Sequence, residues 1–129
     1  QVGCVPGSRG RVTVGTVRGM LERLEQERLV GIFPEGGIHP PDQRVRPKPG
    51  AALLALESGA PVIPARLSGL RQLPGSDLKT FLRPRRVRLR YGEPVDLADL
   101  RRRYQGEGDR TVLTEAADRI QEAIYALRD

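Results

Sequence analysis

The chain has 129 residues, which suits one domain with a single hydrophobic core. Hydrophobic residues make up 38% and charged residues 29%, a balance typical of a folded protein and not of a disordered one. The longest uncharged apolar run, about residues 49–56, is far shorter than the ~20 residues that cross a bilayer as a helix. A single cysteine, Cys4, excludes an internal disulfide framework and a four-thiolate zinc site, and favours a reducing, cytosolic compartment.

Arginine dominates the charge. Lysine and arginine together number 22 against 16 acidic residues, for a formal net charge of +6, and all of the 22 except Lys48 and Lys79 are arginine. Because the guanidinium fork matches phosphate and carboxylate, this excess favours an anionic partner, either a membrane surface or a nucleic acid. Aromatic residues make up only 4%, which disfavours a binder that stacks single-stranded bases. For most of these arginines the favoured interpretation is a solvated face of a strand or a polar helix end. The densest clusters are Arg83, Arg85, Arg86, Arg88 and Arg90, and Arg101, Arg102 and Arg103.

Apolar residues recur along the chain with alternating strand and helix periods. Thr16 is the expected N-cap of the first helix, and Gly59 the expected stop of the second. Alternation of arginine with apolar residues predicts a half-buried strand with one charged face near residue 89. In chain order, the predicted elements are a strand at 2–5, a helix at 17–28, a strand at 29–33, a helix at 48–58, strands at 61–67 and 87–91, a helix at 97–104 and a last helix from Thr111 or Thr114.

This order of elements predicts an α/β fold with a mixed, largely parallel sheet flanked by helices. Neither an internal repeat nor a linker divides the sequence, so residues 1–129 are expected to form one domain. The sequence opens on Gln1 and moves at once into an apolar, strand-like segment, and we therefore expect it to be incomplete at the N-terminus.

Two glycine-bearing loops follow predicted strands, at residues 4–10 and 31–39. Ligands of open α/β sheets bind at such loops, where glycine lets backbone N–H groups approach an anion. Arg9 in the first loop is a natural fork for phosphate. Glu35 in the second either holds Arg9, accepts a hydrogen bond from a substrate hydroxyl, or is an exposed turn residue. The second loop is not a nucleotide-binding P-loop, because Gly37 and Ile38 stand where lysine and a hydroxyl residue are needed.

Four sequence blocks resemble one known family, the 1-acyl-glycerol-3-phosphate acyltransferases of the lysophospholipid acyltransferase superfamily. Residues 32–37, Ile-Phe-Pro-Glu-Gly-Gly, resemble its Phe-Pro-Glu-Gly-Thr block. Residues 5–9 are similar to its second block, which ends in an arginine. Residues 48–64 look like its following helix and fourth block, and residues 87–97 like the next strand and turn. The order and spacing of the blocks match over nearly the whole chain.

The resemblance implies a glycerolipid acyltransferase-like fold, of which residues 1–129 are the C-terminal portion. It implies transfer of a fatty acyl group from acyl-CoA or acyl-carrier protein to lysophosphatidate or a related lysophospholipid, in phospholipid biosynthesis. The protein would be cytoplasmic and peripheral at the inner face of an anionic membrane, with no cofactor beyond the acyl donor and no metal. Arg9 would contact the acceptor's phosphate, Pro34, Glu35, Gly36 and Gly37 would shape the acceptor pocket, and Val62, Ile63 and Pro64 would line the acyl or thioester side.

In that family a His-x4-Asp block supplies the general base, and this block is absent here. The only histidine, His39, has Asp42 at the wrong spacing. We therefore expect the catalytic pair to precede Gln1, and residues 1–129 alone to be inactive. Other departures are Gly37 in place of the block's threonine and Ser8 where an aspartate often precedes the arginine. Two alternatives stay open, a basic nucleic-acid-binding module and a catalytically inactive lipid-binding relative; the first leaves the Phe-Pro-Glu-Gly loop unexplained.

Overall fold

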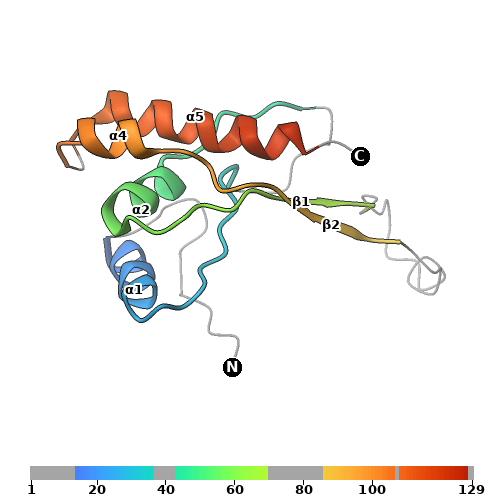
Figure 1. The fold of residues 1–129 in the computed structure, drawn as a ribbon, viewed down its shortest axis with the longest axis horizontal. Helices are drawn as coiled ribbons and strands as arrows, with labels where there is room; N and C mark the ends of the chain where they lie inside the picture. Colours follow the sequence, from blue (N-terminus) through green and yellow to red (C-terminus); the bar gives the residue numbers. More distant parts are fainter. Residues whose placement is uncertain (1–13, 37–42, 70–85, 107, 128–129) are drawn as a thin grey trace.

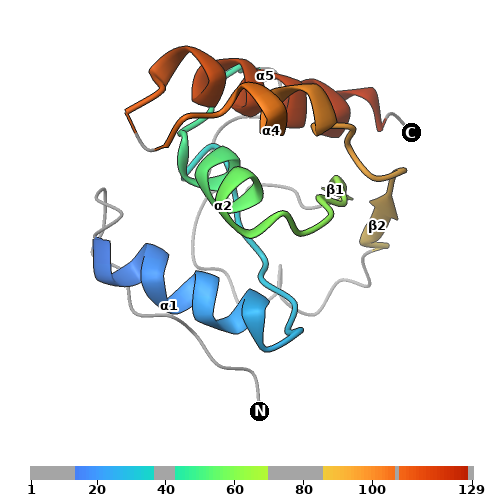
Figure 2. The same cartoon turned by 60° about the vertical axis from the view of Figure 1, so that its left-hand side comes forward.

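A computed structural model describes residues 14–36, 43–69, 86–106 and 108–127. Figure 1 shows helices stacked at one end of the molecule and a two-stranded ribbon that extends away from them. Figure 2 shows α2 lying between α1 on one side and α4 with α5 on the other. The elements are α1 (Val14–Glu25), α2 (Gly50–Ser58), β1 (Ala65–Ser68), β2 (Arg88–Tyr91), α4 (Ala98–Arg103) and α5 (Arg110–Ala126).

Helix α2 is at the centre of the packing. Its sequence is alanine and leucine from residue 51 to 56, with no apolar stripe on one side only, which is typical of a helix that is buried all round. It packs against α1 and α5, and its small alanines allow close approach of the neighbouring helices. The helix ends at Gly59, which has φ 66° in the left-handed region, so the predicted glycine stop is confirmed.

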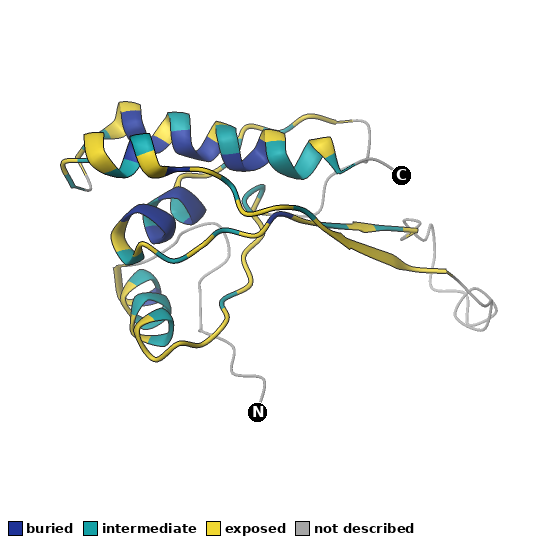
Figure 3. Ribbon diagram, viewed as in Figure 1, coloured by how far each residue is buried: buried dark blue, intermediate teal, exposed yellow. Residues whose placement is uncertain are grey.

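The core lies where α2, α4 and α5 meet. Leu97 and Leu100, at the start of α4, are the two largest fully buried side chains among the described residues. Figure 3 shows the buried positions of α5 on the side that faces α2. The buried cluster comprises Ala52, Ala55, Leu56, Leu97, Leu100, Val112, Leu113, Ala116, Ala117 and Ile120.

Arginines connect these helices. The Nη2 of Arg101 donates to the carbonyl oxygens of Ala55 (3.3 Å) and Ala60 (2.7 Å), at and just beyond the last turn of α2. Carbonyls at a helix C-terminus lack intrahelical partners and attract cations, so Arg101 fastens α4 to the end of α2.

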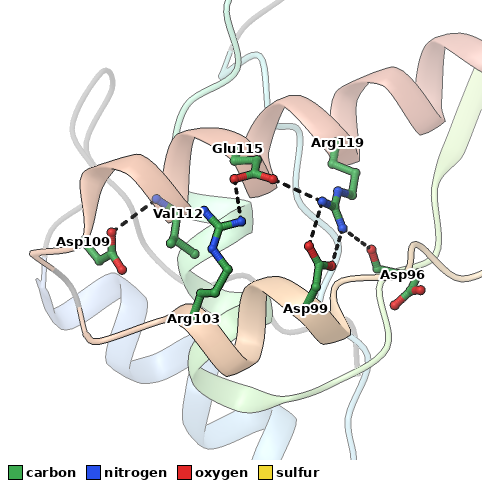
Figure 4. A network of polar contacts seen from close by, with 7 residues as sticks. All are labelled: Asp96, Asp99, Arg103, Asp109, Val112, Glu115 and Arg119. Atoms are coloured by element: carbon green, nitrogen blue, oxygen red, sulfur yellow. Dashed lines mark hydrogen bonds and ion pairs between the residues drawn. The ribbon is translucent and has the colours of Figure 1, made fainter.

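A second set of arginine contacts joins α4 to α5 (Figure 4). The guanidinium of Arg119 donates to both carboxylate oxygens of Asp99, at 2.6 and 3.1 Å. It also donates to Glu115 (3.3 Å), which pairs with Arg103 (3.1 Å). Asp109 caps the start of α5 by accepting from the Val112 N–H. The hydrogen bond from Arg119 lowers the pKa of Asp99 to about 2.

The prediction of mixed helix and strand content is confirmed. The predicted largely parallel sheet is not found among the described residues. Their one sheet is the antiparallel pair β1–β2, with Ala65 opposite Tyr91 and Leu67 opposite Leu89. Residues 29–33 form no strand, and Leu29 is 96% exposed. An apolar segment forms a strand only where a neighbouring strand provides its backbone hydrogen-bond partners. Here β1 pairs with β2 and not with residues 29–33. The predicted strand at 2–5 lies outside the described residues.

Three local predictions also differ from the structure. Thr16 is not an N-cap, because α1 includes Val14 and Thr16 is buried inside the helix. The ribbon strand β2 is exposed at all four positions and not half-buried. Only the second half of the predicted strand at 61–67 is regular, since Pro61 and Pro64 have no N–H to donate to a ladder.

The Asp99–Arg119 pair predicts a specific pH dependence of stability. The pKa of Asp99 in the folded protein, about 2, lies below its ordinary value of 3.8. The pair therefore stabilises the fold above the unfolded-state pKa, and this contribution is lost as the pH falls through the folded-state pKa. In urea unfolding at a series of pH values, the wild type should lose stability between about pH 4 and pH 2 more steeply than Asp99→Asn. Asp118→Asn, at an exposed position of α5, is the control; if Asp99→Asn kept the wild-type slope, the assignment would be wrong.

Candidate functional site

The turn expected to shape an acceptor pocket is built by backbone hydrogen bonds. The N–H of Gly36 donates to the Phe33 carbonyl at 3.0 Å, and the Lys48 N–H donates to the Pro34 carbonyl at 2.8 Å. Proline in the second position and glycine in the fourth are both favoured in turns of this size. We call residues 33–36 the acceptor turn. The second hydrogen bond ties this turn to the chain that leads into α2.

The side chain of Lys48, a cation, lies against Gly36 of the acceptor turn. Its φ of 67° is in the left-handed region, which glycine adopts without strain. A Cβ at Gly36 would lie 2.7 Å from both Cε and Nζ of Lys48. The missing side chain is therefore what leaves room for Lys48 over the turn, next to the peptide that carries Glu35.

The half-buried side chain of Glu35 is held by α5. Its Oε1 accepts a hydrogen bond from the Tyr125 hydroxyl at 2.9 Å. The Nε2 of Gln121, one turn earlier in the helix, donates to the same hydroxyl at 2.9 Å and to the Val45 carbonyl at 2.7 Å. These contacts join two segments that are 90 residues apart in the sequence.

The segment predicted to line the acyl or thioester side, residues 62–64, is held by a different set of hydrogen bonds. The Val62 carbonyl accepts from the Val95 N–H, and the Pro64 carbonyl accepts from the Gly92 N–H, both at 2.9 Å. Val62 packs against the core and Pro64 is buried, whereas Ile63 is exposed. Of these three residues, Ile63 presents the most side-chain surface to a ligand, and the role of the segment on the acyl side stays a prediction.

The structure thus brings Pro34, Glu35 and Gly36 together in one turn, as the sequence predicts. Arg9 and Gly37 lie outside the described residues, so the convergence of the arginine loop with this turn stays a prediction. The roles of Gln121 and Tyr125 were not predicted from the sequence. The available signal was weak: two polar residues at i and i+4 beside the apolar stripe of α5.

Metal ligands, membrane-spanning helices and a surface recess can be assessed in the described part of the chain. Residues 14–36, 43–69, 86–106 and 108–127 contain no group of three or more His, Cys, Asp or Glu side chains that could hold a metal. None of their helices is long and apolar enough to cross a bilayer. An open recess of about 620 Å³ lies at the N-terminal end of α5, the opposite end from Tyr125, and is lined by Arg102, Arg103, Gln105, Gly108, Asp109, Thr111 and Val112.

Gly36→Ala should destabilise the protein by about 1–2 kcal/mol, because a non-glycine residue is strained in the left-handed region. The new Cβ would also displace the Lys48 side chain. Chemical denaturation gives the change in the free energy of unfolding. Gly31→Ala is the matched control, since a Cβ there meets nothing within 4 Å, and its effect should stay within about 0.5 kcal/mol. Equal effects of the two substitutions would contradict the geometry of the turn.

The chain is similar to a known protein family. A family model described as Acyltransferase matches residues 1–68, just over half of the chain, and this stretch includes the acceptor turn and ends with β1. No solved structure matches the chain. Helix α5, which holds Glu35, lies outside the matched stretch. Because the match covers more than half of the sequence and includes the turn, this chain belongs to the acyltransferase family.

Proposed function

We propose that this acyltransferase moves a fatty acyl group from acyl-CoA or acyl-carrier protein to lysophosphatidate or a related lysophospholipid, a step of phospholipid biosynthesis. Family membership supports acyl transfer in general. The observation that carries the narrower proposal is the acceptor turn, in which the Glu35 carboxylate is held by Tyr125 and the Lys48 side chain lies against Gly36. A carboxylate accepts a hydrogen bond from a glycerol hydroxyl, and a cation attracts a phosphate.

The chemistry requires a base that this turn does not provide. The base removes the proton from the acceptor hydroxyl, whose oxygen attacks the thioester carbon. A carbon–oxygen bond forms, the carbon–sulfur bond breaks, and the thiolate leaves and takes up a proton. We propose that this base is a histidine of a His-x4-Asp block upstream of Gln1, as the family resemblance implies. In this scheme Glu35 and Arg9 bind the acceptor and do not transfer the proton.

Arg9→Ala in the intact enzyme, with the proposed upstream block, should weaken acceptor use far more than donor use. Loss of a charged hydrogen bond to phosphate should lower kcat/KM for lysophosphatidate by about 10- to 100-fold, while KM for the acyl donor stays constant. Arg110→Ala, an exposed arginine at the start of α5, serves as the control. Equal losses for acceptor and donor would exclude Arg9 as the phosphate contact, and turnover by residues 1–129 alone would refute the upstream base.

We propose that the β1–β2 ribbon faces the anionic membrane that holds such an acceptor. Side chains alternate along a strand, so the register places Arg66 and Arg90, directly opposite each other, on one face, and Leu67 and Leu89 on the other. Arg88, two residues before Arg90, shares the arginine face and is exposed. An exposed cation on this face is attracted to anionic lipid headgroups.

Arg88→Glu should weaken binding to phosphatidylglycerol vesicles at least about fivefold, since each basic residue near such a surface contributes about 1 kcal/mol. Co-sedimentation with the vesicles measures the binding, and phosphatidylcholine vesicles should bind weakly throughout. Arg110→Glu carries the same charge reversal at the start of α5, the end of that helix away from the ribbon (Figure 1), and should retain wild-type binding. If both substitutions reduced binding alike, net charge and not the ribbon would be responsible. Stronger binding to duplex DNA than to the vesicles would favour the nucleic-acid alternative.

A further inference from the structure

We infer that Tyr125 is a positioning residue of the acceptor site: its hydroxyl fixes the Glu35 carboxylate in the orientation in which Glu35 meets the acyl acceptor. This inference rests on the proposed function of the acceptor turn. It assigns a role in acceptor binding to α5, which lies outside the stretch matched by the acyltransferase family model.

The direction of the hydrogen bonds follows from counting protons. The Val45 carbonyl can only accept, so the group of Gln121 that faces it at 2.7 Å must be the amide nitrogen. The same nitrogen donates its second proton to the Tyr125 oxygen. The single proton of the Tyr125 hydroxyl is then directed to Glu35, where it meets Oε1. The chain of bonds therefore has one consistent direction, from the buried amide to the carboxylate.

Tyr125 is itself held from two sides. Gln121, which fixes its hydroxyl, is only 4% exposed and sits next to the buried Ile120 on α5. The guanidinium of Arg44 lies 5.0 Å from the centroid of the Tyr125 ring, within cation–π range, and is paired with Glu122 at 3.2 Å. The hydroxyl is thus presented by a helix that is anchored in the core.

The acceptor turn has little packing of its own. Phe33 is 83% exposed and Gly36 is also exposed, so apolar burial does not fix the position of this loop. A binding group on such a loop needs support from a rigid element to hold its orientation. Tyr125 gives Glu35 that support through Oε1 and leaves the second carboxylate oxygen to accept from a ligand hydroxyl.

The first test compares two tyrosines in the intact enzyme. Tyr125→Phe removes the hydroxyl but keeps the ring, and should raise KM for lysophosphatidate about three- to tenfold, with kcat and KM for the acyl donor unchanged. Tyr104→Phe is the matched control, because the Tyr104 hydroxyl also donates to a glutamate, Glu57, at 2.6 Å, between α4 and α2. An equal change in both variants, or a loss in kcat alone, would overturn the positioning role.

The second test asks whether Tyr125 acts through Glu35. In a double-mutant cycle, Tyr125→Phe should have no further effect on KM for lysophosphatidate once Glu35→Ala is present. Fully additive effects would show that Tyr125 acts by another route and would overturn the inference.

A third measurement separates this inference from the proposed function. Amide hydrogen exchange in the intact protein should be faster at Gly36 and Lys48 in Tyr125→Phe than in the wild type, and unchanged there in Tyr104→Phe. Unchanged exchange at both amides in Tyr125→Phe would overturn the positioning role whatever the substrate. Faster exchange in an enzyme that acylates no lysophospholipid would support the tether and overturn the proposed acceptor.

Discussion

Helix α2 carries no polar side chain from Gly50 to Leu56, so it is stable only where other helices cover it on both sides. Its burial between α1 and α5 therefore determines how the rest of the chain is arranged. The segment that enters α2 passes Lys48, whose N–H holds the Pro34 carbonyl. Helix α5, which covers α2, carries the Tyr125 hydroxyl that holds Glu35. The acceptor turn is thus hydrogen-bonded both to the segment that leads into α2 and to α5, two parts of the chain that pack against each other. These two attachments explain how an exposed loop keeps a defined position.

The arginines occupy at least two distinct settings in the described part of the chain. Arg101 and Arg119 act inside the fold, where they satisfy the carbonyls near the end of α2 and join α4 to α5. Such residues contribute to the net charge but are already engaged, and they are poor candidates for an anionic partner. The arginine face of the ribbon differs, because Arg88 is exposed on an element that projects from the helical layer (Figure 1). Composition alone could not separate these two settings, since both kinds of arginine count equally in it.

Features with a local cause were predictable. The glycine stop at Gly59, the proline-and-glycine turn at residues 33–36 and helices close to α1, α2, α4 and α5 depend on neighbours within a few residues. The sheet was not predictable in the same way. Residues 29–33 and β1 both read as buried strands, yet β1 pairs with β2, and Leu29 faces solvent. Apolar character indicates that a segment can be buried, but strand pairing depends on which segment lies beside it.

The sequence by itself indicated an acyltransferase, through short blocks whose residue types and spacing are properties of the chain alone, and the family model confirms that coarser assignment. It also singled out Glu35 as a candidate ligand-binding residue, although it left the partner of that carboxylate open. Only the tertiary structure decided that Tyr125 holds Glu35, with Gln121 behind it. The reason is that a hydrogen bond between residues 90 positions apart forms only after α5 has packed on α2, and no local pattern encodes the result of that packing.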